Sequence, residues 1–166
     1  MYNYNYNREW PKFEVGGSNY DSGKKLLREI RLPGVYHEPI IETILNDPDY
    51  KACKSPKLYH LCTKAPRDLG FTGLVYKPEF YSRAEKDGLY LVHSDTPIIL
   101  RIRYKDQLEK QDIHAAMEPL NVGGREIIFT LTVTCGQNGT MLWIRVIDTK
   151  WNAKLKPDDE FLFCKQ

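Results

Sequence analysis

Aromatic and basic side chains alternate with aliphatic ones along several segments in the second half of the chain. Arg101 and Arg103 lie two residues apart, as do Trp143 and Arg145, and Tyr90 stands in a third segment of this kind. Because side chains of a strand point alternately to two faces, each pair is expected to project from one face. Guanidinium groups follow phosphates and aromatic rings stack on bases, which is the chemistry of single-strand nucleic-acid binding.

A second group of such side chains occupies residues 77–87, a polar and aromatic segment that is predicted to be a loop. Loops between strands of small β-barrels often clamp an oligonucleotide. This loop adds four candidate nucleic-acid contacts, which are Phe80, Tyr81, Arg83 and Lys86.

Two other interpretations stay open. Arg101 and Arg103 can form an ordinary solvated strand face, and Trp143 can pack beneath another element or mark a protein interface. The apolar segment Phe161, Leu162 and Phe163 must also be covered by something, which favours contact with a partner protein. The alternative function is therefore an adaptor that holds other subunits without binding nucleic acid.

No set of residues converges on catalysis or metal binding. The sequence lacks GxSxG, HExxH, P-loop and dinucleotide-binding motifs. His93 and Asp95 share one turn, whereas His114 lies in a predicted helix. The spacing of His60 and Cys62 does not match a zinc site. The sequence predicts a protein that is not an enzyme and has no cofactor or metal.

Composition sets wider limits. The chain has 166 residues, enough for one domain, and its formal net charge is only +2, so any cationic surface must be local. No apolar run approaches the ~20 residues of a membrane span, and the first residues do not resemble a secretory signal. Four irregularly spaced cysteines favour reduced thiols in an intracellular protein without membrane contact.

The first third of the chain reads as an arm followed by two helices. Residues 1–22 contain alternating Tyr and Asn and then turn formers, which favours a flexible arm. Residues 23–56 form a predicted helical extension. Ser22 can cap a helix over 23–31, Pro33-Gly34 ends it, and Pro39 suits the first turn of a second helix to about Leu45.

The rest of the chain predicts an all-β core in an α+β protein. Strands are expected over 69–75, 89–93 and 98–104, then a helix over 105–118, then a hairpin of 127–134 and 141–146. Gly73 suggests a β-bulge. This order is typical of a five-stranded OB-fold Greek-key barrel, here over 57–150, with a C-terminal segment over 151–166.

At this point the chain resembles a known family. FTGLVY, GLYLVHSDTPIILRIRYKD, NVGGREIIFTLTV and NGTMLWIRVID are similar to strands of the replication protein A middle-subunit OB-fold, including relatives in telomere-capping complexes such as insect terminin. Pro97 stands where the family has a turn glycine. The resemblance implies a nuclear subunit of a hetero-oligomer that binds single-stranded nucleic acid, DNA rather than RNA, at chromosome ends.

The alternation also predicts which residues face the core. Thr130 and its neighbours at every second position are expected to point outward. The inward set is Leu89, Leu91, Ile98, Leu100, Ile102, Ile127, Phe129, Leu131, Val133, Leu142, Ile144 and Val146.

Overall fold

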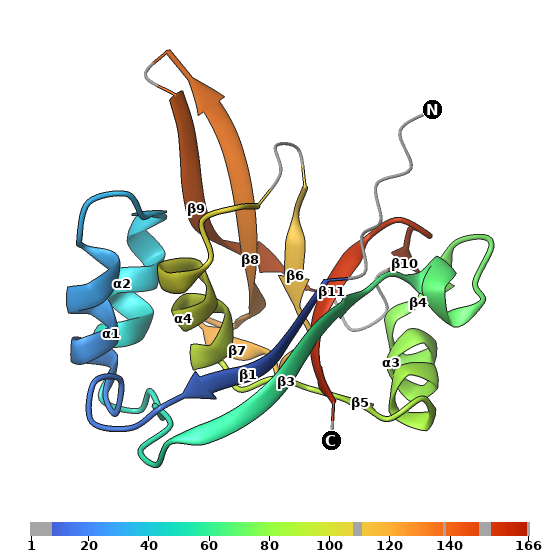
Figure 1. Ribbon diagram of the computed structural model, residues 1–166, viewed down its shortest axis with the longest axis horizontal. Helices are drawn as coiled ribbons and strands as arrows, with labels where there is room; N and C mark the ends of the chain where they lie inside the picture. Colours follow the sequence, from blue (N-terminus) through green and yellow to red (C-terminus); the bar gives the residue numbers. More distant parts are fainter. Residues whose placement is uncertain (1–7, 108–110, 138, 150–153, 166) are drawn as a thin grey trace.

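The computed structural model describes residues 8–107, 111–137, 139–149 and 154–165. Over these residues the chain is an α+β fold with one large mixed sheet, a small two-stranded sheet and four α-helices (Figure 1). None of the helices in these ranges is both long enough and apolar enough to cross a membrane.

The large sheet runs in the order β1-β3-β11-β6-β8-β9-β2. Two short strands are added outside this order: β5 pairs with β11, and β7 pairs with β8. Most neighbours are antiparallel, but β11 is parallel to β6 and β9 is parallel to β2. β4 and β10 form the small sheet. The strands are β1 Glu9–Val15, β2 Tyr36–His37, β3 Lys57–Lys64, β4 Val75–Tyr76, β5 Leu89–Tyr90, β6 Ile113–Ala115, β7 Leu120–Val122, β8 Arg125–Gly136, β9 Gly139–Asp148, β10 Lys154–Leu155 and β11 Glu160–Lys165.

The long hairpin β8–β9 confirms the clearest prediction from the sequence. Its register runs from Ile127 opposite Asp148 to Gly136 opposite Gly139. Gly139 has a φ of 109°, a conformation that a residue with a Cβ rarely adopts. The hairpin therefore forms where alternation and turn chemistry agree.

The two N-terminal helices are also confirmed. α1 spans Gly23–Ile30, with the Ser22 hydroxyl accepting from the Lys25 amide, and α2 spans Pro39–Asn46. A Cβ on Gly23 would lie 2.0 Å from the carbonyl oxygen of Leu45, so only glycine permits this close approach of α1 to α2. The apolar sides of both helices are buried.

The predicted strand over 98–104 is wrong, because Asp95–Arg103 is helix α4. All side chains from Asp95 to Arg101 are buried, and α4 contacts α1 and strands β1, β8 and β9. Because all residues from Asp95 to Arg101 are buried, α4 lacks the apolar and polar faces by which a helix is recognised in a sequence. Its branched aliphatic residues can then be mistaken for those of a strand.

Other parts of the predicted OB-fold differ in the same region. Residues 113–115 form strand β6 rather than the end of a helix, and the predicted loop over 77–87 is helix α3, Lys77–Lys86. Residues 66–69 form a 3₁₀ helix, η1 Pro66–Leu69, where the first strand was expected to begin, and Gly73 lies exposed outside any strand. The sheet does not close as a barrel, so the OB-fold is not confirmed.

Both ends of the described chain belong to the large sheet. The predicted arm contains β1, which pairs with β3. The predicted C-terminal segment contains β11, which lies between β3 and β6. Residues 1–7 and 150–153 lie outside the described residues. The remaining parts of the two segments contribute strands to the sheets, so they are not a flexible arm and a peripheral tail.

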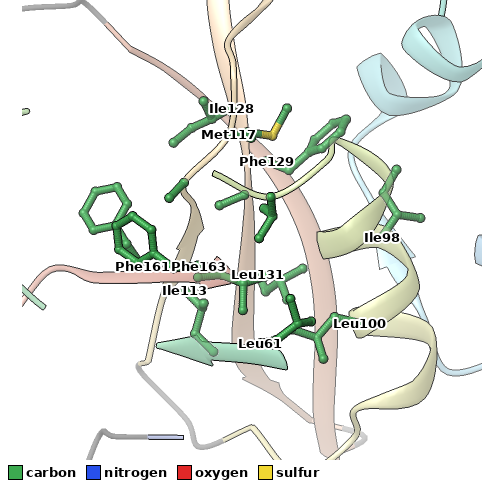
Figure 2. Packing of buried hydrophobic residues seen from close by; sticks show 14 of the residues in the cluster. Leu61, Ile98, Leu100, Ile113, Met117, Ile128, Phe129, Leu131, Phe161 and Phe163 are labelled. Carbon is green, nitrogen blue, oxygen red and sulfur yellow. The ribbon is translucent and has the colours of Figure 1, made fainter. Parts of the chain in front are cut away.

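One buried cluster joins the sheet to the helices. Figure 2 shows part of this cluster, to which β3 contributes Leu61, β8 contributes Leu131 and α4 contributes Leu100. Most of the predicted inward set is buried, but Leu91 is 37% exposed, and Ile102 and Val146 are only partly buried. Thr130 was predicted to point to solvent and is buried, because the second face of this sheet is covered as well.

Candidate nucleic-acid interface

Arg101 lies inside the protein and not on a strand face. Its side chain is fully buried in α4, and one nitrogen, Nη2, donates to Oε1 of Gln107. The other two, Nε and Nη1, have no hydrogen-bond partner among the described residues. Burial lowers the pKa of Arg101 to about 10. A nucleic acid on the surface could not reach this guanidinium, so the predicted contact between Arg101 and nucleic acid is wrong.

Arg103 is exposed but already engaged. Its guanidinium carbon lies 5.3 Å from the ring centre of Phe13 and 5.5 Å from that of Tyr20, and its Nη1 donates to the carbonyl oxygen of Glu14 at 3.1 Å. Residues two apart on a helix point in widely different directions, so Arg101 and Arg103 do not share a face. Arg103 instead attaches the end of α4 to β1.

The candidates over residues 80–90 are divided between the core and the surface around α3. Phe80 is buried, and Phe80 and Tyr81 both pack on Phe161. Desolvation raises the pKa of Tyr81, whose hydroxyl is buried. Arg83 pairs with Asp87 at 3.6 Å on the surface. Lys86 is exposed, and Tyr90 is half-buried in β5. These side chains do not form the expected clamp loop.

The argument for a partner contact at the C-terminal apolar segment no longer holds. Phe161, Leu162 and Phe163 are all buried in β11 at the centre of the sheet. The apolar segment is therefore covered by the protein itself.

Trp143 and Arg145 are brought together as predicted. They lie two apart on β9, and the guanidinium carbon of Arg145 lies 5.2 Å from the ring centre of Trp143. The indole Nε1 donates to the Thr134 hydroxyl across the hairpin at 3.0 Å, which fixes the ring. Tyr36, from β2, packs against the same indole with ring centres 5.3 Å apart. We call Tyr36, Trp143 and Arg145 the Tyr36–Trp143 cluster.

Tyr36 is the member of this cluster that sequence reasoning missed. It is 44% exposed and lies opposite Trp143 in the parallel pairing of β2 with β9. Glu38 secures the pairing, because its amide donates to the Ile144 carbonyl at 3.2 Å and its carboxylate accepts from the Val146 amide at 3.1 Å. No local pattern announces a contact between residues so far apart in sequence.

A separate row of cations lies on α1. Lys24, Arg28 and Arg31 follow an i, i+4, i+7 spacing on one side of α1 and are exposed. We call these three residues the α1 stripe. Arg31 donates to both carboxylate oxygens of Glu42, at 3.1 and 2.5 Å. The His37 imidazole, next to Tyr36, lies 2.9 Å from the same carboxylate.

Glu42 therefore links the α1 stripe to strand β2. The hydrogen bonds from Arg31, and then from His37, lower the pKa of Glu42 to about 2, so this carboxylate is charged at neutral pH. An exposed tyrosine beside an indole and a guanidinium can stack on a base and attract a phosphate.

No metal site accompanies this surface within the part of the chain that the structure describes, since no three His, Cys, Asp or Glu side chains gather there. None of the four cysteines is in a disulfide, and Cys53, Cys62 and Cys164 are buried whereas Cys135 is exposed. Comparisons of the chain with models of protein families, with curated proteins and with solved structures find no match.

Proposed function

We propose that this protein binds single-stranded nucleic acid, DNA in the first instance, through the Tyr36–Trp143 cluster, and that it does so as a non-enzymatic subunit of a protein complex. The observation that carries the proposal is the exposed ring of Tyr36, supported from beneath by Trp143 and flanked by the Arg145 guanidinium. A ring held in place by a second ring loses little freedom when a base stacks on it.

The α1 stripe supplies the electrostatic part of the proposal. Each phosphate neutralised on a single strand changes log K by about −0.7 per unit of log salt. Contact with all three cations of the stripe then gives a slope of roughly −2. With a net charge of only +2 the isolated chain binds weakly, and partner subunits add affinity.

The family assignment is a separate part of the proposal. Membership of the replication protein A middle-subunit type, and with it a nuclear role in telomere capping, rests on the sequence resemblance. The open mixed sheet lends no support to a five-stranded barrel. Nucleic-acid binding by the Tyr36–Trp143 cluster does not depend on that assignment.

The test is binding of a labelled thymidine oligomer and a labelled uridine oligomer at two salt concentrations, followed by fluorescence anisotropy. Tyr36→Ala should weaken binding about 5- to 150-fold, the equivalent of about 1–3 kcal/mol for one lost stack. Lys24→Glu with Arg28→Glu should flatten the salt dependence.

The chain contains a matched control for Tyr36. Tyr76 is 49% exposed and has the Lys154 ammonium 5.2 Å from its ring centre, so it is a second surface pair of tyrosine and cation. Tyr76→Ala should leave binding unchanged. Equal losses for Tyr36→Ala and Tyr76→Ala would show that binding is not localised at the cluster.

The adaptor alternative has its own supporting observation. Leu74 and Tyr76 lie two residues apart and are 65% and 49% exposed, an unusual exposure for large apolar side chains. If neither oligomer binds the protein, alone or with co-purified subunits, the adaptor function replaces nucleic-acid binding.

A further inference from the structure

Helix α3 has a cavity along each of two adjoining stripes of its surface. Both stripes follow the i, i+3, i+4, i+7 spacing of one helix face. The first, which lines a cavity of about 350 Å³, consists of Pro78, Tyr81, Ser82 and Glu85. The second, which lines a cavity of about 330 Å³, consists of Glu79, Ser82, Arg83 and Lys86. We call these hollows the Glu85 cavity and the Lys86 cavity.

The Glu85 cavity lies where the chain reverses after α3. Gly88 has a φ of 75°, a conformation that favours glycine, and it turns the chain from α3 into β5. β5 pairs with β11 through only two residues, and Leu91, which follows them, is 37% exposed. The cavity is lined by the first stripe of α3 on one side and by residues 89–91 on the other, together with Phe163 of β11.

The walls of the Glu85 cavity are mainly apolar. Leu89, Leu91 and Pro78 contribute aliphatic surface. Tyr81 and Phe163 contribute rings whose centres lie 6.0 Å apart and whose planes cross at 80°. Aromatic walls attract another ring by more than the area that it buries. A hollow of this size and lining is typical of small-molecule sites, whose volumes begin at about 300 Å³.

The two cavities differ in charge. Glu85 is the one charged residue among the described residues that line the first cavity, and it is exposed. Arg83, two residues away, pairs with Asp87 at 3.6 Å and not with Glu85. The Lys86 cavity is lined by two cations and one carboxylate. The Glu85 cavity therefore favours a cation, whereas the Lys86 cavity favours an anion.

We propose that the Glu85 cavity binds small organic amines that carry an aromatic ring on a short chain. The ring lies against Leu91 and Tyr81, and the ammonium pairs with the Glu85 carboxylate. Tyr81 and Glu85 are four residues apart on one helix, with Cβ atoms about 5–6 Å apart, which suits a ring and an ammonium separated by about two carbon atoms. This inference uses no residue of the Tyr36–Trp143 cluster, so either proposal can fail without the other.

The first experiment compares two ligands with the same ring and opposite charges. The full chain is titrated with phenethylamine and with 3-phenylpropanoate by isothermal titration calorimetry. A ligand of this size should bind with a Kd of about 1 mM or lower. Phenethylamine should bind at least about tenfold more tightly than 3-phenylpropanoate, because the carboxylate of the latter would meet Glu85. Equal affinities for the two ligands would overturn the proposal.

Glu79 supplies a matched control for Glu85. It is also exposed on α3, but it lines the Lys86 cavity. Glu85→Gln should weaken phenethylamine binding about two- to fivefold, the range of an exposed ion pair, and Glu79→Gln should leave it unchanged. Leu91→Asn should weaken binding at least about threefold by removing an apolar wall. Equal losses for Glu85→Gln and Glu79→Gln would overturn the proposal.

A second experiment needs no substitution. In amide NMR spectra of the nitrogen-15-labelled full chain, phenethylamine should shift the signals of residues 81–91 most. The described chain has another cavity, of about 430 Å³, that is lined by Asp47 and Asp49 and offers carboxylates without the aromatic pair. If the largest shifts fell on residues 43–50 and 120–123 instead, charge alone would select the binding site and the proposal would be overturned.

Discussion

The hairpin β8–β9 and helix α4 have similar sequences and opposite structures. Both contain branched aliphatic residues, and both contain an arginine that alternation places outside. In the hairpin Arg145 is half-buried and its guanidinium lies over the ring of Trp143. In α4 the corresponding Arg101 is buried without a carboxylate partner. Alternation therefore identifies a strand only when its pairing partner is close in sequence.

The largest effect that can test this comparison is expected in the hairpin. Phe129 is fully buried at the centre of β8, and Phe129→Ala should lower the free energy of unfolding by about 3–5 kcal/mol. Urea denaturation followed by circular dichroism measures this. A loss under about 1 kcal/mol would mean that the β8 side of the core is not packed as described.

Ile99 distinguishes a helix from a strand in the 95–103 segment. In a strand Ile98, Leu100 and Ile102 would face inward and Ile99 would be exposed, whereas in α4 Ile99 is fully buried and Ile102 is only partly buried. Ile99→Ala should therefore cost about 2–5 kcal/mol and clearly more than Ile102→Ala. If Ile102→Ala lowered the urea midpoint more than Ile99→Ala, the segment would be a strand and not a helix.

Thr130 tests whether the second face of the hairpin is covered. Its hydroxyl lies 3.0 Å from Nδ1 of His114, and its side chain is buried. Thr130→Val keeps the shape but leaves the imidazole nitrogen without that partner, which should cost about 1–3 kcal/mol. If Thr130→Val left the urea midpoint unchanged, Thr130 would face solvent, as the alternation predicts.

Arg101→Met should have a small effect or a stabilising one. Replacing a buried charge with an apolar side chain of similar length is often neutral or stabilising by about 1–4 kcal/mol. Gln107 loses one bond, which offsets part of the gain. Arg145→Met, at a half-buried position, should leave stability within about 0.5 kcal/mol and weaken oligonucleotide binding. Marked destabilisation by Arg101→Met alone would show that its buried hydrogen bond is essential.

Glu160 gives the smallest expected effect, and it depends on pH. Burial raises the pKa of Glu160, so its contribution to stability is complete below its unfolded pKa and is lost as the pH rises through its folded pKa. Glu160→Gln should therefore flatten the decline in thermal midpoint between acidic and neutral pH. A wild-type midpoint that does not decline over this range would contradict the assignment.

The predictable parts of the fold are those determined by neighbours in sequence. Ser22 and Pro39 mark the starts of α1 and α2, and Gly139 marks the hairpin turn. β1, β6 and β11 could not be predicted because each is a strand only by virtue of a distant partner, as in the pairing of Phe163 with Cys62. Short apolar segments have no preference strong enough to decide this alone.

The same division applies to the Tyr36–Trp143 cluster. Trp143 and Arg145 could be placed together because they are two residues apart on one strand. Tyr36 could not be placed, since it reaches Trp143 through a contact between residues far apart in sequence. Residue type and local spacing therefore identify the site residues that are close in sequence, whereas the residues brought in by long-range pairing are seen only in the structure.

The central position of β11 has a consequence for how the protein is made. β1 and β3 lie on one side of it, and β6, β8, β9 and β2 lie on the other. Until residues 160–165 are in place, the β1–β3 pair and the β6–β8–β9–β2 strands each have an unpaired inner edge. Such edges are prone to pair with other chains. The large sheet is therefore complete only when residues 160–165, the last strand of the described chain, pair with both edges.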